Sequence, residues 1–130
     1  MPITYERDDD RRLITATATE PYSADDILGV IDRQAAEDTW GYATLYDWRA
    51  VMRLPTDTEV RQAAERVKIA GDGRERGPVG IIAIGAHAKQ LLGIGLEYGK
   101  LTKKLVPVEV LFTSAQLDDW LARNARRRRT

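Results

Sequence analysis

The sequence contains no cysteine and a single histidine, His87, among its 130 residues. The lack of cysteine excludes disulfide bonds, thiolate metal sites and cysteine nucleophiles. One histidine is too few for a zinc site built on several imidazoles. Only two serines are present, Ser23 and Ser114, and both stand where a helix is expected to begin. The composition therefore predicts no metal, no other cofactor and no serine nucleophile.

Long apolar runs and net charge are missing too. No stretch approaches the roughly 18 consecutive apolar residues that a membrane-spanning helix needs, and the first residues do not resemble a secretory signal. We therefore expect a cytoplasmic protein without a membrane span. The 20 basic and 20 acidic residues balance. This balance argues against specific nucleic-acid binding, because proteins of that class usually carry a basic excess.

The chain is long enough for one domain and too short for two of ordinary size. We assign the domain to residues 1–122 and a basic tail to residues 123–130. The tail holds five arginines, at positions 123 and 126–129, so that the remainder has fifteen basic against twenty acidic residues. We expect the tail to be disordered and to serve solubility; the alternative is weak, salt-sensitive contact with nucleic acid or anionic lipid.

Patterns of apolar residues predict strands alternating with helices. The expected strands cover residues 2–6, 12–18, 43–48, 79–84 and 107–112. Three of the expected helices are capped by Ser23, Thr56 and Ser114, and a fourth covers residues 86–105. The first two strands should pair as an antiparallel hairpin. The order β-β-α-β-α-β-α-β-α predicts an α/β fold with a mostly parallel sheet and helices packed on it.

This order resembles that of the STAS-like (SpoIIAA-like) family, which includes anti-sigma-factor antagonists and domains of sulfate transporters. Short segments carry the resemblance: PITYE at residues 2–6 with RLIT at 12–15, LYDWRAV at 45–51, VEVLF at 108–112 and LDDWL at 117–121. Together they span the chain from residue 1 to about residue 122. The resemblance implies an interaction or regulatory module that binds a protein partner and catalyses no reaction.

In the anti-sigma-factor antagonists, a serine at the start of the helix after the third strand is phosphorylated. The corresponding region here has Pro55 and Thr56 and lacks both serine and glycine. A helix N-terminus would stabilise a phosphate on Thr56. Thr56 is therefore a candidate phosphorylation site, and the plain alternative is that it only caps its helix.

The ends of the third and fourth strands supply the other candidate binding residues, because ligands of open α/β sheets sit beyond the carboxyl ends of the strands. After the third strand these are Asp47, Trp48 and Arg49; after the fourth they are Gly85 and His87. The plain alternatives are that Asp47 pairs with Arg49 and that His87 lies on the surface. An enzyme that uses His87 with Asp47 is the third-ranked hypothesis, behind a partner-binding module and a carrier.

The carrier hypothesis is the alternative function. An apolar pocket between the sheet and the helix at residues 86–105 would suit a lipid or another small apolar ligand. Glycines at 93, 95 and 99 lie within that helix and do not have the spacing or the position of a nucleotide-binding loop. A homodimer is compatible with the sequence, although no feature demands one.

Overall fold

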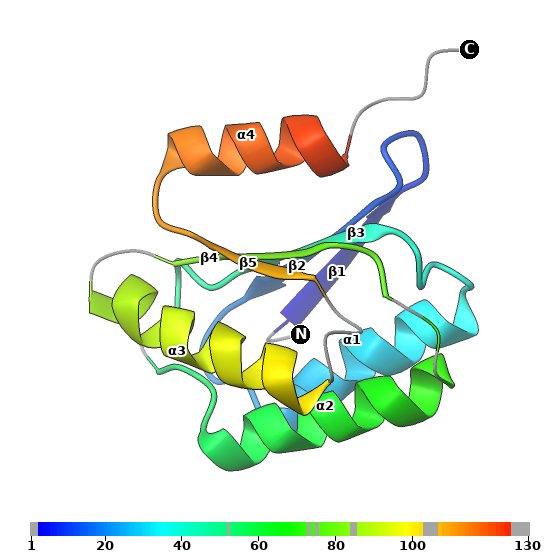
Figure 1. Cartoon of the computed structure of the whole chain (residues 1–130), viewed down its shortest axis with the longest axis horizontal. Coiled ribbons are helices and arrows are strands. Elements are labelled where there is room, and N and C mark those ends of the chain that lie inside the picture. Colours follow the sequence, from blue (N-terminus) through cyan, green and yellow to red (C-terminus); the bar gives the residue numbers. More distant parts are fainter. Residues whose placement is uncertain are drawn as a thin grey trace.

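The computed structural model describes residues 3–51, 53–72, 74, 76–83, 86–102 and 107–125, without the side chains of residues 86–88. In this part of the chain, a pair of strands is followed by alternating helices and strands (Figure 1). The elements are β1 (Ile3–Asp8), β2 (Leu13–Ala18), α1 (Ala24–Ala36), β3 (Ala43–Asp47), α2 (Asp57–Gly71), β4 (Val79–Ile82), α3 (Ala86–Leu101), β5 (Val108–Leu111) and α4 (Ser114–Asn124). The predicted α/β class and order of elements are confirmed.

The five strands form one sheet in the order β1-β2-β3-β4-β5. Strands β1 and β2 pair antiparallel, as the hairpin prediction requires, whereas the three remaining pairings are parallel. Each parallel connection runs between neighbouring strands in the same direction across the sheet. Right-handed crossovers of this kind place their helices on one face. Figure 1 accordingly shows α1, α2 and α3 below the sheet and α4 alone above it.

Strands β3 and β4 are buried on both faces, as the apolar run at residues 79–84 predicts for its strand. Tyr46 and Ile81 join the core beneath α1–α3, and Leu45 and Ile82 join the core beneath α4. This division follows from the two-residue period of a strand. Trp120 of α4 is fully buried in the second core.

The predicted caps of α1 and α2 are confirmed. Ser23 and Thr56 each accept a hydrogen bond from the backbone N–H three residues later, and the acidic side chain at that third position binds back to the cap. The prediction that Ser114 caps the last helix is wrong. Thr113 has the extended backbone of a cap, and its hydroxyl accepts from the N–H of Gln116, so that Ser114 is the first helical residue.

Several boundaries differ from the predicted ones. Helix α3 ends at Leu101, before the expected end at residue 105, and residues 103–106 lie outside the described part of the chain. Helix α4 continues to Asn124, so that Arg123, which we assigned to the tail, is helical and pairs with Glu109 and Asp119. The arginines at 126–129 also lie outside the described residues. In the part that the structure describes, none of the helices has the length and apolar character needed to cross a membrane.

Gly80 provides a test of how α4 is seated on the sheet. A Cβ atom added to Gly80 would lie 2.7 Å from the ring of Trp120, whereas one added to Gly29 on α1 would meet no atom within 4 Å. We predict that Gly80→Ala lowers the free energy of unfolding by about 1–3 kcal/mol, because the indole must shift. Gly29→Ala should instead raise it by up to about 1 kcal/mol, because alanine favours the helix. Urea unfolding of both variants checks the pair; equal effects would contradict this packing.

Candidate functional site

Asp47 and Arg49, two of the residues predicted after β3, form an ion pair with each other. Arg49 donates from Nη2 to Oδ2 of Asp47 at 2.8 Å, and from Nε and its backbone N–H to Oδ1 at 3.0 Å each. Burial by itself would raise the pKa of Asp47, but these hydrogen bonds outweigh it and lower the pKa below its usual value. Both carboxylate oxygens are therefore already engaged within the chain.

Trp48 points into the core and not toward solvent. Its side chain is 4% exposed, its ring is stacked on Tyr46 with centroids 6.2 Å apart, and it is tilted against Tyr22 at 5.0 Å. The side chain of Trp48 therefore lies inside the protein, whereas the side chains of Asp47 and Arg49 are at least partly exposed. Its contacts are with the interior between the sheet and the helices.

Thr56 belongs to a network at the start of α2. The N–H of Thr56 donates to Oε1 of Glu59 at 3.0 Å, and Arg53 donates to both carboxylate oxygens of Glu59 at 2.7 and 3.1 Å. The guanidinium of Arg53 also covers the ring of Tyr22 at 4.0 Å. Hydrogen bonds from Arg53 lower the pKa of Glu59 below its usual value. The hydroxyl of Thr56 accepts from the N–H of Glu59 at 3.2 Å, so any modification of this oxygen would disturb the cap.

The residues predicted after β4 cannot be placed as a site. Gly85 lies outside the described residues, and His87 belongs to α3 but its side chain is not described. Among the residues that are described, no group of three or more histidine, aspartate or glutamate side chains is arranged to hold a metal ion.

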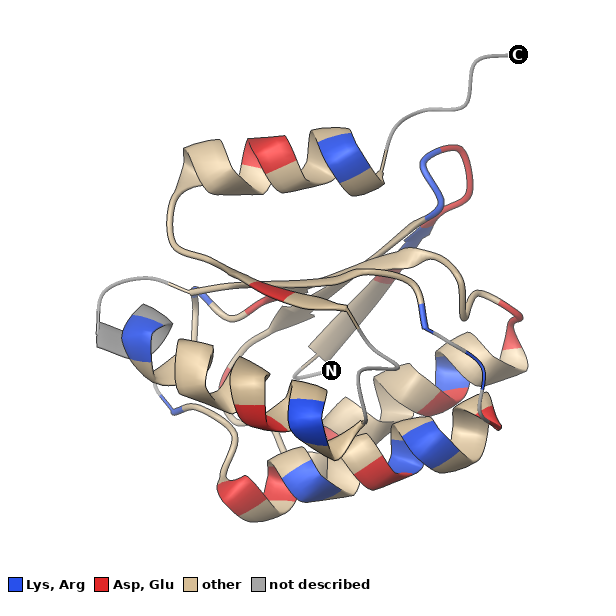
Figure 2. Ribbon diagram, viewed as in Figure 1, with Lys and Arg blue, Asp and Glu red and all other residues tan. Residues whose placement is uncertain are grey.

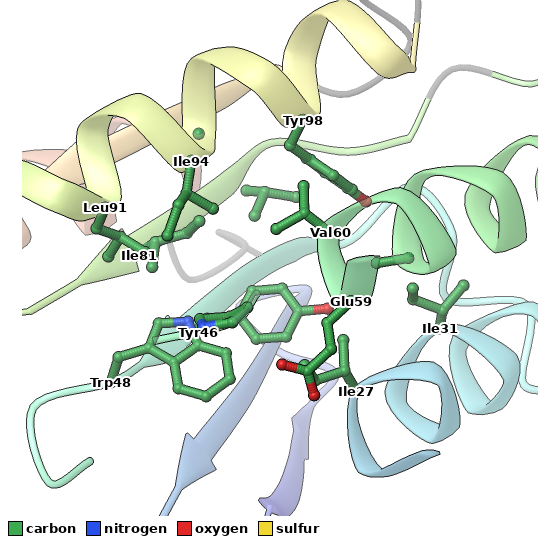
Figure 3. A pocket seen from close by; sticks show the side chains of 14 residues that line it. Ile27, Ile31, Tyr46, Trp48, Glu59, Val60, Ile81, Leu91, Ile94 and Tyr98 are labelled. Carbon is green, nitrogen blue, oxygen red and sulfur yellow. The ribbon is translucent and has the colours of Figure 1, made fainter. Parts of the chain in front are cut away.

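A small apolar cavity lies between the sheet and helices α1, α2 and α3 (Figure 3). Its volume is about 60 Å³. The side chains around it come from every layer of this half of the protein: Ile27, Ile31, Tyr46, Trp48, Pro55, Glu59, Val60, Ala63, Val79, Ile81, Leu91, Ile94, Gly95 and Tyr98. Trp48 and the α2 cap residue Glu59 therefore meet here. The position is the one that the carrier hypothesis requires, but the volume falls short of the several hundred Å³ typical of a carrier pocket.

A buried arginine that the sequence did not single out lies next to this cavity. Arg76, in the loop before β4, is 2% exposed. Its Nη2 donates to Oε1 of Gln34 and, at 3.4 Å, to the hydroxyl of Tyr46. Burial disfavours the charged form of Arg76, and the hydroxyls of Tyr46 and Tyr98, which are neutral at neutral pH, offset this in part. A charged guanidinium is thus held inside the protein.

The outer face of α3 carries exposed leucines. Leu92 is 45% exposed and Leu96 is 63% exposed, and residues four apart lie on the same face of a helix. Leu91 and Tyr98, which line the cavity, lie on the opposite face. Figure 2 shows basic residues near both ends of α3 and an acidic residue between them. The inner face of α3 thus serves the fold, while the leucines of the outer face are left in solvent.

Comparison of the chain with protein-family models, with curated proteins and with solved structures found no match.

The α2 cap network gives a pH-dependent stability. Because the pKa of Glu59 is lowered in the folded protein, its contribution is present above the unfolded-state pKa of about 4.3 and is lost as the pH falls through the lower, folded value. We predict that Glu59→Gln costs about 1 kcal/mol at neutral pH and flattens the loss of stability below about pH 5. Arg53→Met should flatten it similarly. Urea unfolding across this range checks both, and an unchanged acid limb would contradict the assignment.

Replacing Arg76 is predicted to stabilise the protein, although most substitutions of buried residues destabilise. Replacing it by methionine removes a buried charge that no carboxylate neutralises within the described residues, while leaving the acceptor oxygen of Gln34 without this donor. The first effect outweighs the second, so Arg76→Met should raise the free energy of unfolding by about 1 kcal/mol. Thermal unfolding of the purified variant measures the change. A large loss of stability would show that the charge is well compensated.

Proposed function

We propose that this chain is a STAS-like interaction module of the cytoplasm that binds a protein partner and catalyses no reaction. The order of strands and helices supports the family resemblance of the sequence. The pairing of Asp47 with Arg49 also supports a binding role over catalysis, because it leaves neither carboxylate oxygen free to act as a base without breaking the pair.

The observation that carries this proposal is the exposure of Leu92 and Leu96 on one face of α3. Single exposed leucines are common on protein surfaces, but two in register form a continuous apolar strip. Gly93 lies beside them, and a Cβ atom added there would meet nothing within 4 Å. The fold does not require glycine at this position, and a glycine within a helix weakens it. A partner that packs against Leu92 and Leu96 could approach the helix backbone closely at Gly93, because glycine has no side chain.

The network at the start of α2 is the place where regulation would act. Thr56 and Glu59 share the capping box, and Arg53 neutralises Glu59. A phosphate on Thr56 would meet the carboxylate of Glu59 and compete for Arg53. Phosphorylation at the candidate site Thr56 would therefore rearrange the start of α2 beside the cavity.

The carrier remains the second candidate because a cavity lies where that hypothesis places it. Its volume of about 60 Å³ admits only a small molecule and no lipid chain of ordinary length. The exposed strip on α3 has no role in such a carrier. Partner binding explains the strip and is the better-supported function.

A photo-crosslinking experiment tests the partner-binding face. With p-benzoylphenylalanine in place of Leu96, in cells of the source organism, we expect one discrete crosslinked species, which mass spectrometry identifies. The same residue at position 62, exposed on α2, is the control. Discrete crosslinking at 62 but not at 96 would overturn the choice of face, and no species at either position would overturn the proposal.

Affinity measurements on the identified partner complete the test. Leu96→Glu should weaken binding by at least about tenfold, because it places a charge in the centre of an apolar contact. Ile69→Glu, at an exposed position on α2, should leave binding unchanged. Isothermal titration calorimetry measures both. Since each side chain lies in solvent, neither substitution should change the unfolding temperature by more than a few degrees.

A further inference from the structure

The apolar cavity and the buried Arg76 share two tyrosines. The rings of Tyr46 and Tyr98 line the cavity. The hydroxyl of Tyr46 accepts a hydrogen bond from Arg76, and the hydroxyl of Tyr98 also interacts with this guanidinium. Figure 3 shows the two hydroxyl oxygens pointing toward the same end of the cavity, away from Leu91 and Ile81. The cavity therefore has an apolar end and an end with two hydroxyls, and the guanidinium of Arg76 lies beyond these hydroxyls, outside the lining itself. Glu59 also lines the cavity, with its carboxylate paired with Arg53.

The cluster around Arg76 has more hydrogen-bond donors than acceptors. Among the described residues, the buried side-chain atoms without a partner are Nε and Nη1 of Arg76 and Nε1 of Trp40. All three are donors, and the guanidinium lies 5.3 Å from the Trp40 ring. The hydroxyl of Tyr46 accepts from Arg76, and the described part of the chain shows no acceptor for its own proton. What this cluster lacks is an acceptor.

The cluster also lacks a negative charge. None of the ion pairs between described residues includes Arg76. A buried charge normally comes with a partner, because desolvating it costs several kcal/mol that only an opposite charge or full hydrogen bonding offsets. A carboxylate supplies both: it has acceptor lone pairs only, and it matches the planar fork of a guanidinium.

The opposite end of the cavity suits a short hydrocarbon body. Ile81, Leu91 and Ile94 surround it there, and their side chains offer apolar contacts to a small hydrocarbon group. At about 60 Å³, the cavity has room for a few carbon atoms. Burial also raises the pKa of Tyr98 to about 12, so its hydroxyl stays protonated and able to donate at neutral pH.

We propose that this interior site binds a small amphipathic carboxylic acid in its ionised form. The carboxylate accepts hydrogen bonds from the hydroxyls of Tyr46 and Tyr98 and lies next to the guanidinium of Arg76, and a short aliphatic body fills the apolar end. The site lies on the inner side of α3, so it is separate from the partner-binding strip on the outer side and does not depend on it.

Protein-observed NMR titration of the full chain with sodium butanoate and with 1-butanol tests the site. The two probes each contain four carbon atoms and differ in that only butanoate has a charged head. At neutral pH and constant sodium concentration, we expect butanoate to bind at least about tenfold more tightly than butanol. The shifts should centre on residues that line the cavity. Equal affinities, or no saturable binding of butanoate, would overturn the proposal without the need for any variant.

Three variants locate the two ends of the site. Arg76→Met should weaken butanoate to about the affinity of butanol and leave butanol within about twofold. Arg74→Met is the matched control, because this exposed arginine also lies beside Trp40, at 5.9 Å, and its loss should leave the preference for the acid intact. Ala63→Leu should weaken both probes by filling the cavity. An acid preference that survives Arg76→Met, or is lost equally in Arg74→Met, would refute the assigned head-group site.

Discussion

Strands β3 and β4 bury side chains on both faces, and the rest of the architecture depends on this constraint. A strand cannot send all its side chains to one side, so each face needs its own cover. The right-handed connections between neighbouring strands place α1, α2 and α3 on one face. The other face is left to α4, which fills it with Trp120 packed over Gly80. The basic chain end thus begins directly beyond a helix that the fold requires.

Tyr46 connects the sheet to the interior features of the larger core. It lies on β3, stacks with Trp48 and receives a hydrogen bond from Arg76. Arg76 also donates a hydrogen bond to Gln34 on α1 and interacts with the hydroxyl of Tyr98 on α3. One loop residue therefore contacts three elements that are far apart along the chain. The shape of the cavity depends on this cluster, because both tyrosines are part of its wall.

Helix α3 has two faces with different roles. Its inner face holds Leu91, Ile94 and Tyr98 against the sheet and closes the cavity. Its outer face offers Leu92 and Leu96 to solvent. A partner on the outer face and a small molecule on the inner face would act on the same helix from opposite sides. Helix α3 is therefore the element in which the proposed partner binding and ligand binding meet.

The sequence by itself determined the order of elements, the hairpin, the caps at Ser23 and Thr56 and the double burial of β4, because each depends on residues within a few positions of one another. The pairing of Asp47 with Arg49, which the sequence offered as the plain alternative to a binding role, joins residues only two positions apart. Other features were decided by tertiary contacts. Apolar residues occur all round α3, so periodicity could not tell Leu91, which is buried, from Leu92, which is exposed. Arg76 lies among glycines and charged residues typical of a loop, and its burial comes from contacts 30 and 42 positions away in the chain. Local patterns decide where a helix or strand forms, but the burial of a side chain depends on what the fold packs against it.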